Sequence, residues 1–228
     1  LRRIFREMGG FAREQDGGPE SSLSHVAGIN MEGPFLDVSK KGAHRAECIM
    51  PPDVAFFREC NEACGNLIRL VTLAPNAEGA IEFTRQLHEE VAISLGHSAA
   101  DYDIAKKALE AGANHVTHLF NAMQPLGHRA PGLIGAASED EHCMAELICD
   151  GIHVHESMVR AAFKLFPGRI VLISDSMRAT GMENGTYDLG GQQVTVNGKL
   201  ATLADGTIAG SATNLFDCMR TAVSFGIP

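Results

Sequence analysis

The sequence lacks any long apolar run and any concentration of positive charge. No hydrophobic stretch approaches the ~18 residues that a membrane-spanning helix requires. The 19 Lys and Arg residues are scattered among 28 Asp and Glu residues, and the formal net charge is −9. Binding to nucleic acid or to an acidic membrane surface requires a local basic patch. We therefore expect neither a nucleic-acid partner nor a membrane partner.

The sequence also lacks a cysteine framework. Its six cysteines include no CxxC pair and show no regular spacing, so neither a disulfide scaffold nor a cysteine zinc site is expected. Cys60 and Cys64 lie four residues apart, which is typical of two core-facing positions on a helix. These features indicate a reduced protein, and we expect it to be cytoplasmic.

No internal repeat, low-complexity tract or clear linker divides the 228 residues, which are enough for one domain with a substantial core. Short apolar runs alternate with helical patterns, an order typical of parallel strands joined by crossover helices. The alternation predicts an α/β fold. Its expected strands are His25–Met31, Ile68–Ala74, Val91–Leu95, His115–Phe120, Met144–Cys149 and Ile170–Ile173.

Helical patterns fill the gaps between these runs. The expected helices are Asp53–Cys64, Asn76–Glu90, a segment from Ser98 to Gly112 whose Ser98 and Asp101 resemble a capping box, and about Glu156–Phe166. After the sixth run, Gln192–Thr202 predicts a hairpin with a type I′ turn at Asn197-Gly198. A final amphipathic helix carries Leu215, Met219 and Val223 on one face.

Groups that bind metals or move protons follow five of the six expected strands. A lone His or Asp in such a place is usually a hydrogen-bonded structural residue or a helix cap. Recurrence at the same end of successive parallel strands favours a shared site, because α/β barrels build their active sites at that end. The residues are Glu32, His97, His118, Asp150 with His153, and Asp175.

Two histidines and one carboxylate among them form a ligand set often found at catalytic zinc. Glu32, His97 and His118 would leave positions open for water and substrate. A bound divalent cation acidifies its water and polarises a carbonyl. Asp175 then suits the role of general base, and its conjugate acid could protonate a departing amine. Imidazole ligands suit zinc, iron or cobalt, so the metal stays open.

The loops after the fourth strand suit a polar, anionic substrate. Asn121 and Ala122 follow His118 and can offer amide and backbone donors. Arg129 lies in a loop containing Gly and Pro, and arginine forms bidentate contacts with phosphate. Taken alone, Arg129 is more simply interpreted as a surface ion-pair residue.

Six segments together resemble the signature blocks of the N-acetylglucosamine-6-phosphate deacetylases, a family of the amidohydrolase superfamily. The blocks occur in that family's order and span nearly the whole chain. They are Gly28–Arg45 (GINMEGPFLDVSKKGAHR), Gly96–Ala99 (GHSA), His118–Met123 (HLFNAM), Arg129–Gly135, Asp150–His153 (DGIH) and Ala209–Ser211 (AGS).

The resemblance implies a (β/α)₈ TIM-type barrel that hydrolyses the N-acetyl amide of N-acetylglucosamine 6-phosphate to glucosamine 6-phosphate and acetate, in amino-sugar catabolism. It implies one divalent metal ion, zinc first, with iron, cobalt or manganese as alternatives. By position, Glu32, His97 and His118 would bind this metal. Asp175 would act as the acid and base, and His153 would assist at the carbonyl or hold the sugar.

The resemblance also implies the substrate contacts. The sugar would be held by residues of four loops, namely His44, Asn121, Ala122, His153, Ala209, Gly210 and Ser211. Arg129 would hold the phosphate. Because this arginine can come from the neighbouring subunit in the family, a homodimer is implied.

The chain departs from the family at two positions and in length. Ser176 replaces the alanine that usually follows the catalytic Asp, and Ala130 replaces an acid that often follows the arginine. The family has two further barrel strands upstream, the first with a His-x-His or equivalent segment, and a small β-sandwich built from both chain ends. We therefore expect residues 1–228 to be a partial barrel that holds strands three to eight.

Two other functions remain open at this point. Another amide or cyclic-amide hydrolase on the same barrel would act on an unphosphorylated substrate. A sugar-phosphate-binding protein without catalysis would show no turnover, although the intact set of three ligands and Asp175 disfavours it.

Overall fold

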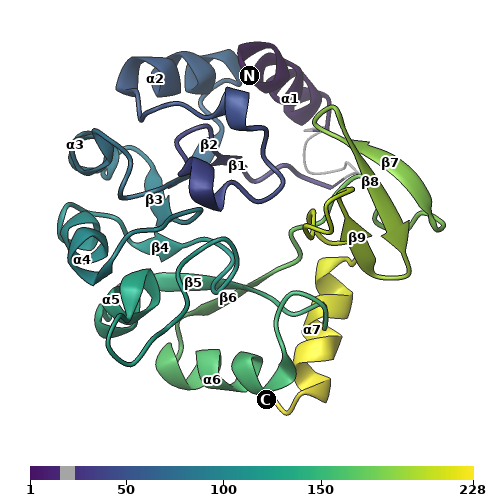
Figure 1. Ribbon diagram of the computed structural model, residues 1–228. Helices are drawn as coiled ribbons and strands as arrows, with labels where there is room; N and C mark the ends of the chain where they lie inside the picture. The colour runs from purple at the N-terminus through teal and green to yellow at the C-terminus, as the bar shows by residue number, and fades with distance from the viewer. Residues whose placement is uncertain (16–23) are drawn as a thin grey trace.

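The computed structural model describes residues 1–15 and 24–228. Its main feature is a six-stranded parallel sheet in which each strand pairs with the next one along the chain. Figure 1 shows the sheet curled into an arc with helices on its outer side, as in part of a barrel. The strands are β1 (Ile29–Glu32), β2 (Ile68–Leu73), β3 (Ala92–Leu95), β4 (His115–Val116), β5 (Met144–Ile148) and β6 (Ile170–Ile173).

All six expected strands are therefore present; β6 has the expected bounds, and the other five are shorter than expected. The largest difference at a C-terminal end is that of the fourth strand, which was expected to run to Phe120 and ends at Val116. Beyond it, His118 and Phe120 have φ angles of 30° and 76°, which no strand can contain. The chain leaves the sheet to form the loop that carries His118.

Helices α2 to α6 lie between successive strands of the parallel sheet, α1 precedes β1, α7 follows β9, and two short 3₁₀ turns follow β1. Several start where a side chain accepts one of the unpaired N–H groups of the first turn. Asp53 accepts from Phe56, and Asp101 accepts from Ile104. The helices are α1 (Arg2–Gln15), α2 (Val54–Ala63), α3 (Ala80–Leu87), α4 (Tyr102–Glu110), α5 (Gly132–Glu139), α6 (Glu156–Leu165) and α7 (Leu215–Ser224), and the turns are η1 (Val38–Lys40) and η2 (Ala46–Cys48).

Two expected helix starts are wrong. Helix α3 begins at Ala80 with Gly79 as its cap, whereas Asn76 hydrogen bonds with Asp37 and Ser98 instead. Helix α4 is capped by Asp101 alone, so the start expected at Ser98 is three residues too early. In both cases the polar side chain holds a loop at the end of a strand rather than a helix terminus.

The main apolar core lies between the sheet and the helices. Val71, Ile93 and Leu147 of the strands are fully buried in it. On the helix side, the ring of Phe83 packs against that of Phe35 with centroids 5.1 Å apart. Burying side chains of this kind stabilises the fold by about 1.5–3 kcal/mol each.

A separate three-stranded antiparallel sheet follows β6. It consists of β7 (Gly185–Leu189), β8 (Gln192–Asn197) and β9 (Leu200–Thr202), and it has its own small core around Val194 and Val196. The expected hairpin is β8–β9, and β7 and α5 were not predicted from the sequence.

The expected type I′ turn at Asn197-Gly198 is also wrong. The two-residue loop is Gly198-Lys199, and of these only Gly198 has a positive φ, 61°, as in a type II′ turn. Two positive φ angles, the type I′ pattern, occur instead at Gly190-Gly191 between β7 and β8.

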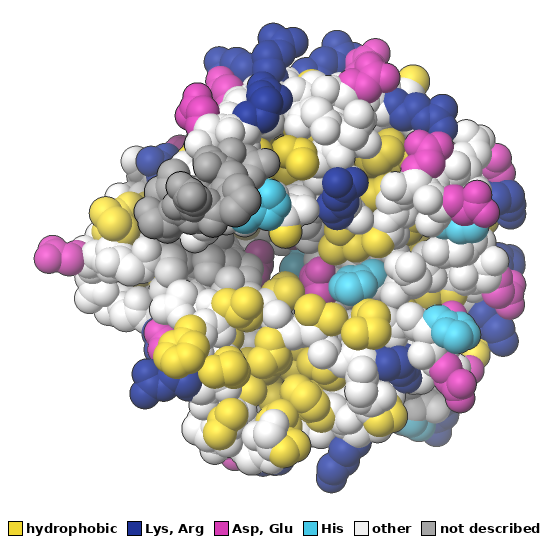
Figure 2. Space-filling model, turned by 180° about the vertical axis from the view of Figure 1, so that it is seen from behind, with side chains coloured by type: hydrophobic (Ala, Val, Ile, Leu, Met, Phe, Trp, Pro, Cys, Tyr) yellow, Lys and Arg dark blue, Asp and Glu magenta, His cyan; other side chains and the backbone are white. Residues whose placement is uncertain are grey.

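The apolar face expected on the last helix is exposed. Leu215, Met219 and Val223 of α7 are 50%, 44% and 57% exposed, and the buried side of the helix consists of Cys218 and Ala222. All four residues of the neighbouring strand β6 are only partly buried. Among the described residues, no strand pairs with the outer edge of β1 or of β6. Figure 2 shows a broad apolar area on the face seen from behind.

No helix among the described residues is long and apolar enough to cross a membrane. All six cysteines lie within the described residues and are free, and five of them are buried.

Candidate active site

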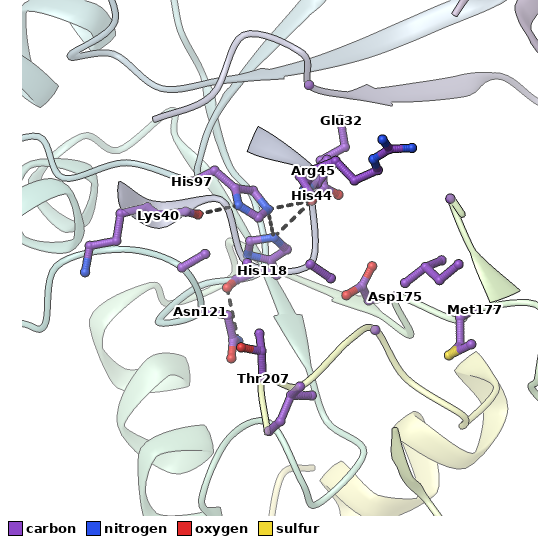
Figure 3. Close-up of a pocket in the computed structure, with 18 of the residues that line it drawn as sticks. Glu32, Lys40, His44, Arg45, His97, His118, Asn121, Asp175, Met177 and Thr207 are labelled. Atoms are coloured by element: carbon purple, nitrogen blue, oxygen red, sulfur yellow. Dashed lines mark hydrogen bonds and ion pairs between the residues drawn. The ribbon is translucent and has the colours of Figure 1, made fainter. Parts of the chain in front are cut away.

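The carboxyl ends of the parallel strands open into a cavity of about 870 Å³. The strand ends contribute Glu32, His97, His118 and Asp175 to its lining. The loop after β1 and the small sheet supply further walls. Figure 3 shows the three expected metal ligands grouped together and Asp175 facing them from the β6 side.

Three side-chain atoms converge at one point of this cavity. His97 Nε2 lies 2.7 Å from Glu32 Oε1, His118 Nε2 lies 3.3 Å from the same oxygen, and the two nitrogens are 3.0 Å apart. The residues come from β1 and from the loops after β3 and β4. Within the described part of the chain, this is the one group of three or more His, Cys, Asp or Glu side chains whose ligand atoms could hold a metal ion.

The hydrogen bonds around His97 suit a cation at that point. Its Nδ1 lies 2.7 Å from the carbonyl oxygen of Lys40, which can only accept, so Nδ1 carries the proton. In the neutral ring, Nε2 then directs a lone pair at Glu32 and His118. A backbone carbonyl behind a ligand imidazole is a frequent way of fixing its tautomer and ring orientation at metal sites. The donor set therefore fits a divalent cation.

The loop that delivers Lys40 passes very close to the His97 ring. Gly42 has a φ of 55°, and a Cβ at this position would lie 3.2 Å from His97 Cε1. Only glycine combines this backbone with that approach at low cost. Asp37 ties the same loop down, because its backbone N–H donates to the His97 carbonyl.

The backbone is strained at three of the functional side chains. His97, His118 and Asp175 have φ angles of 46°, 30° and 49°, in the left-handed region that residues with a side chain seldom adopt. Such residues cost about 1–3 kcal/mol each and cluster at active sites. The strain turns each side chain from its strand end into the cavity, and sequence patterns give no signal for it.

The charges of the cluster favour a cation as well. Burial raises the pKa of Glu32, but hydrogen bonds from His118 and His97 outweigh it and hold that pKa well below its usual value. Burial lowers the pKa of His118, but the hydrogen bond and charge of Glu32 outweigh it and raise this pKa to about 9. The raised pKa of His118 reflects the negative potential of Glu32 at this point, which favours a positive charge there, either a proton or a metal cation.

Asp175 is close to the same charged side chains, but their effects on its pKa combine differently. Burial, followed by the negative charge of Glu32, raises the pKa of its carboxyl to about 6, although three nearby histidines oppose the shift. A carboxyl group with a pKa near the working pH can both accept and return a proton. The environment therefore suits Asp175 to acid and base chemistry.

Five of the other expected site residues line the cavity, namely His44, Asn121, Ala122, His153 and Gly210. Ala209 and Ser211 are fully buried behind the wall, and the Ser211 hydroxyl donates to Asp150.

Arg129 lies outside the cavity. It is exposed, and its Nη1 is 2.7 Å from His128 Nε2. Within a single chain, the expected phosphate-binding arginine therefore does not reach the other groups of the site.

Several lining residues were not predicted from the sequence. Lys40 and Arg45 belong to the Gly28–Arg45 block, so their nearness to His44 could have suggested them. Gln192 and Thr207 come from β8 and from the loop after β9, and no motif marks them. Gln192 Nε2 lies 2.5 Å from the carbonyl oxygen of Ala43, which links the small sheet to the loop after β1.

No family model matches the chain, but curated relatives do. The N-acetylglucosamine-6-phosphate deacetylase of Bacillus subtilis is 46% identical over 214 residues, which are 92% of this chain and 54% of that protein. The N-acetylgalactosamine-6-phosphate deacetylase of Escherichia coli O157:H7 is 37% identical over 212 residues, 92% of this chain and 55% of that protein. The chain thus spans about half the length of the curated relatives it matches.

Solved structures agree with these relatives. An aspartate-to-alanine mutant of N-acetyl-D-glucosamine-6-phosphate deacetylase from Mycobacterium smegmatis, in complex with N-acetyl-D-glucosamine-6-phosphate, superposes with a TM-score of 0.90 at 36% identity. The match covers 99% of this chain and 58% of that protein. The N-acetylglucosamine-6-phosphate deacetylase of Thermotoga maritima superposes with a TM-score of 0.86 at 31% identity. The match covers 100% of this chain and 60% of that protein.

Proposed function

Because the chain is homologous over most of its length to N-acetylglucosamine-6-phosphate deacetylases, we propose that it carries the active site of a metal-dependent deacetylase. The reaction is hydrolysis of the N-acetyl amide of N-acetylglucosamine 6-phosphate to glucosamine 6-phosphate and acetate. The observation that carries the proposal is the convergence of Glu32, His97 and His118 in one cavity with Asp175.

Glu32, His97 and His118 would hold one divalent cation, which we propose to be zinc. When bound, such a cation polarises an amide carbonyl and acidifies water. Asp175, ionised above a pH of about 6, accepts the proton of the attacking water. As the acid, it then gives this proton to the departing amine nitrogen.

His153 approaches the reacting group from the end of β5. Its Nδ1 lies 2.7 Å from Asp150 Oδ2 and therefore carries a proton, which leaves Nε2 for the cavity. In the doubly protonated ring, Nε2 donates to the acetyl carbonyl, whereas in the neutral ring it accepts from a sugar hydroxyl. His44, Asn121 and the backbone at Ala122 and Gly210 supply the remaining contacts to the sugar.

The position of Arg129 supports a homodimer. This side chain is exposed and outside the cavity of its own chain, so a phosphate contact by Arg129 has to be made in the cavity of a second subunit. Ala209 and Ser211 support the sugar-binding loop from behind. We place the reaction in the cytoplasm, which agrees with six free cysteines.

The fold of this chain agrees with part of a (β/α)₈ barrel. We propose that β1–β6 correspond to strands three to eight of the longer relatives. In them, the two upstream strands and a small β-sandwich domain would complete the molecule.

The test is acetate release by the purified full-length gene product, with N-acetylglucosamine 6-phosphate, N-acetylgalactosamine 6-phosphate and unphosphorylated N-acetylglucosamine compared at equal concentration. The galacto sugar is included because one relative is named for it. We expect the gluco phosphate to react fastest and the unphosphorylated sugar slowest. Equal rates with and without the phosphate would favour a general amide hydrolase, and binding without turnover would favour a sugar-phosphate-binding protein.

A further inference from the structure

Asp150, at the carboxyl end of β5, has so far been described only as the partner of His153 Nδ1 and of the Ser211 hydroxyl. Its side chain is fully buried, yet both carboxylate oxygens are in use. Oδ1 accepts from the backbone N–H groups of Ile152 and His153, each at 2.9 Å. Oδ2 accepts from His153 Nδ1 at 2.7 Å and from the Ser211 hydroxyl at 3.0 Å. One buried charge thus has four donors.

The two oxygens serve different purposes. The Oδ1 contacts are local and close a turn after β5, as an Asp in a loop often does. The Oδ2 contacts reach a ring that lines the cavity and a hydroxyl 61 residues along the chain. A turn with a purely structural role would need only the two hydrogen bonds to Oδ1.

Ser211 continues the connection to the general base. Its backbone N–H donates to the Asp175 carbonyl at 2.8 Å, and its own carbonyl accepts from Met177 N–H at 2.9 Å. Asp175 and Met177, the residues on either side of Ser176, are therefore held by the residue that Asp150 binds. This pairing supports the left-handed backbone that turns Asp175 into the cavity.

The carboxylate is suited to hold both groups at once. Burial raises the pKa of Asp150, but the hydrogen bonds from His153 outweigh it and lower this pKa to about 2. The group is ionised at any working pH and can only accept hydrogen bonds. It therefore fixes the proton of His153 on Nδ1 and the orientation of its ring.

We propose that Asp150 is a positioning residue that sets the tautomer of His153 and, through Ser211, the backbone of Asp175. This inference rests on the proposed function, because it assigns work to His153 and Asp175 in amide hydrolysis. Asp150 touches neither the substrate nor the cation cluster in this account.

Asp150→Asn separates the two purposes of the carboxylate. The amide oxygen can still accept from both backbone N–H groups, whereas the NH₂ group placed at Oδ2 cannot accept from His153 Nδ1–H. The ring must then shift its proton to Nε2. In the full-length gene product loaded with zinc, we expect kcat to fall about 10- to 100-fold, by analogy with the loss of partners behind metal-bound histidines, with metal content unchanged.

The decisive measurements are a double-mutant cycle and the tautomer. Asp150→Asn is expected to add little to the loss caused by His153→Gln, and ¹⁵N NMR of the imidazole is expected to show the proton on Nδ1 in the wild type and on Nε2 in the variant. Equal losses in both backgrounds, or a wild-type ring that carries no proton on Nδ1, would overturn the proposal. Should Asp150→Asn fail to fold, Ser211→Ala is the second variant, with a several-fold loss of kcat and an unchanged tautomer expected; unchanged kcat overturns the Asp175 link.

The two hypotheses fail in different ways. If the wild-type protein releases no acetate, the proposed function is wrong, but the NMR tautomer still decides whether Asp150 orients His153. If acetate is released and the cycle is additive, the function stands and the positioning role is wrong.

Discussion

Glu32 Oε1 is the point on which two imidazole nitrogens converge, so removing any member of the cluster leaves two ligands. A catalytic zinc site usually has three protein ligands. We expect His118→Ala in the full-length gene product to abolish both bound metal and activity, measured by elemental analysis and acetate release. The matched control is His142→Ala, which changes an exposed histidine outside the cavity. Full metal occupancy in His118→Ala would remove this residue from the ligand set.

Asp175 faces the cluster without belonging to it. Asp175→Asn keeps the size and shape of the side chain, but the amide cannot accept the proton of water. We expect metal and substrate binding to persist while kcat falls by about 10² or more. A loss confined to KM would assign Asp175 to binding.

The raised pKa of Asp175 also predicts a pH dependence. The carboxylate is the active form, so kcat/KM should fall as the pH drops through the pKa, which is about 6 in the protein without a cation. A nearby divalent cation favours the charged form, so the acidic limb of the holoenzyme is expected at or below pH 6. This limb should vanish from the residual activity of Asp175→Asn. An acidic limb above pH 7 in the wild type would contradict the assignment.

Arg129 tests the contribution of a second subunit. We expect Arg129→Ala to raise KM for the 6-phosphate sugar. The ratio of its kcat/KM to that of plain N-acetylglucosamine should therefore become smaller. The control is Arg85→Ala, which removes an exposed arginine paired with Glu82 on α3. If Arg129→Ala raises the KM of both substrates by the same factor, the residue has a structural role.

At the scale of elements, helix caps have measurable consequences. Asp101 accepts a hydrogen bond from Ile104 N–H at the start of α4, whereas Asp103 in the same turn makes no such cap. We expect Asp101→Ala to lower the free energy of unfolding by about 1 kcal/mol and Asp103→Ala to change it much less. Denaturant titration of both variants measures the difference, and equal effects would mean that general charge, not the cap, matters.

Strand order was predictable because buried parallel strands are short apolar runs, and their ends are marked by His, Asp and Glu. The starts of α3 and α4 were not, because Asn76 and Ser98 have the chemistry of caps but are used to hold loops together. No local pattern distinguishes these two uses. The same limit applies to Ser211, whose hydroxyl contacts Asp150, 61 residues away along the chain.

At the scale of the whole molecule, the described surface includes apolar groups that a stable monomer usually covers. Phe216 and Val223 of α7 are 64% and 57% exposed, and β6 beside it has an unpaired outer edge among the described residues. Each such side chain forgoes about 1.5–3 kcal/mol of burial, and an open strand edge invites pairing with other chains.

A protein consisting only of residues 1–228 is therefore expected to aggregate or to fold poorly and to turn over little substrate. Light scattering during size-exclusion chromatography and thermal melting measure this. Phe216→Ser with Val223→Ser should reduce aggregation, whereas Arg220→Ser on the same helix should not. A monomeric, cooperatively melting and fully active protein of these 228 residues would show that the strands have been miscounted.

We propose that this cavity hydrolyses an amide with the help of a cation held by Glu32, His97 and His118. The most direct measurement is the initial rate of acetate release from N-acetylglucosamine 6-phosphate by the full-length gene product before chelation, after chelation and after one equivalent of zinc per chain is restored. We predict release in the first sample, almost none in the second and recovery in the third. Release that continues undiminished after complete removal of metal would contradict the account.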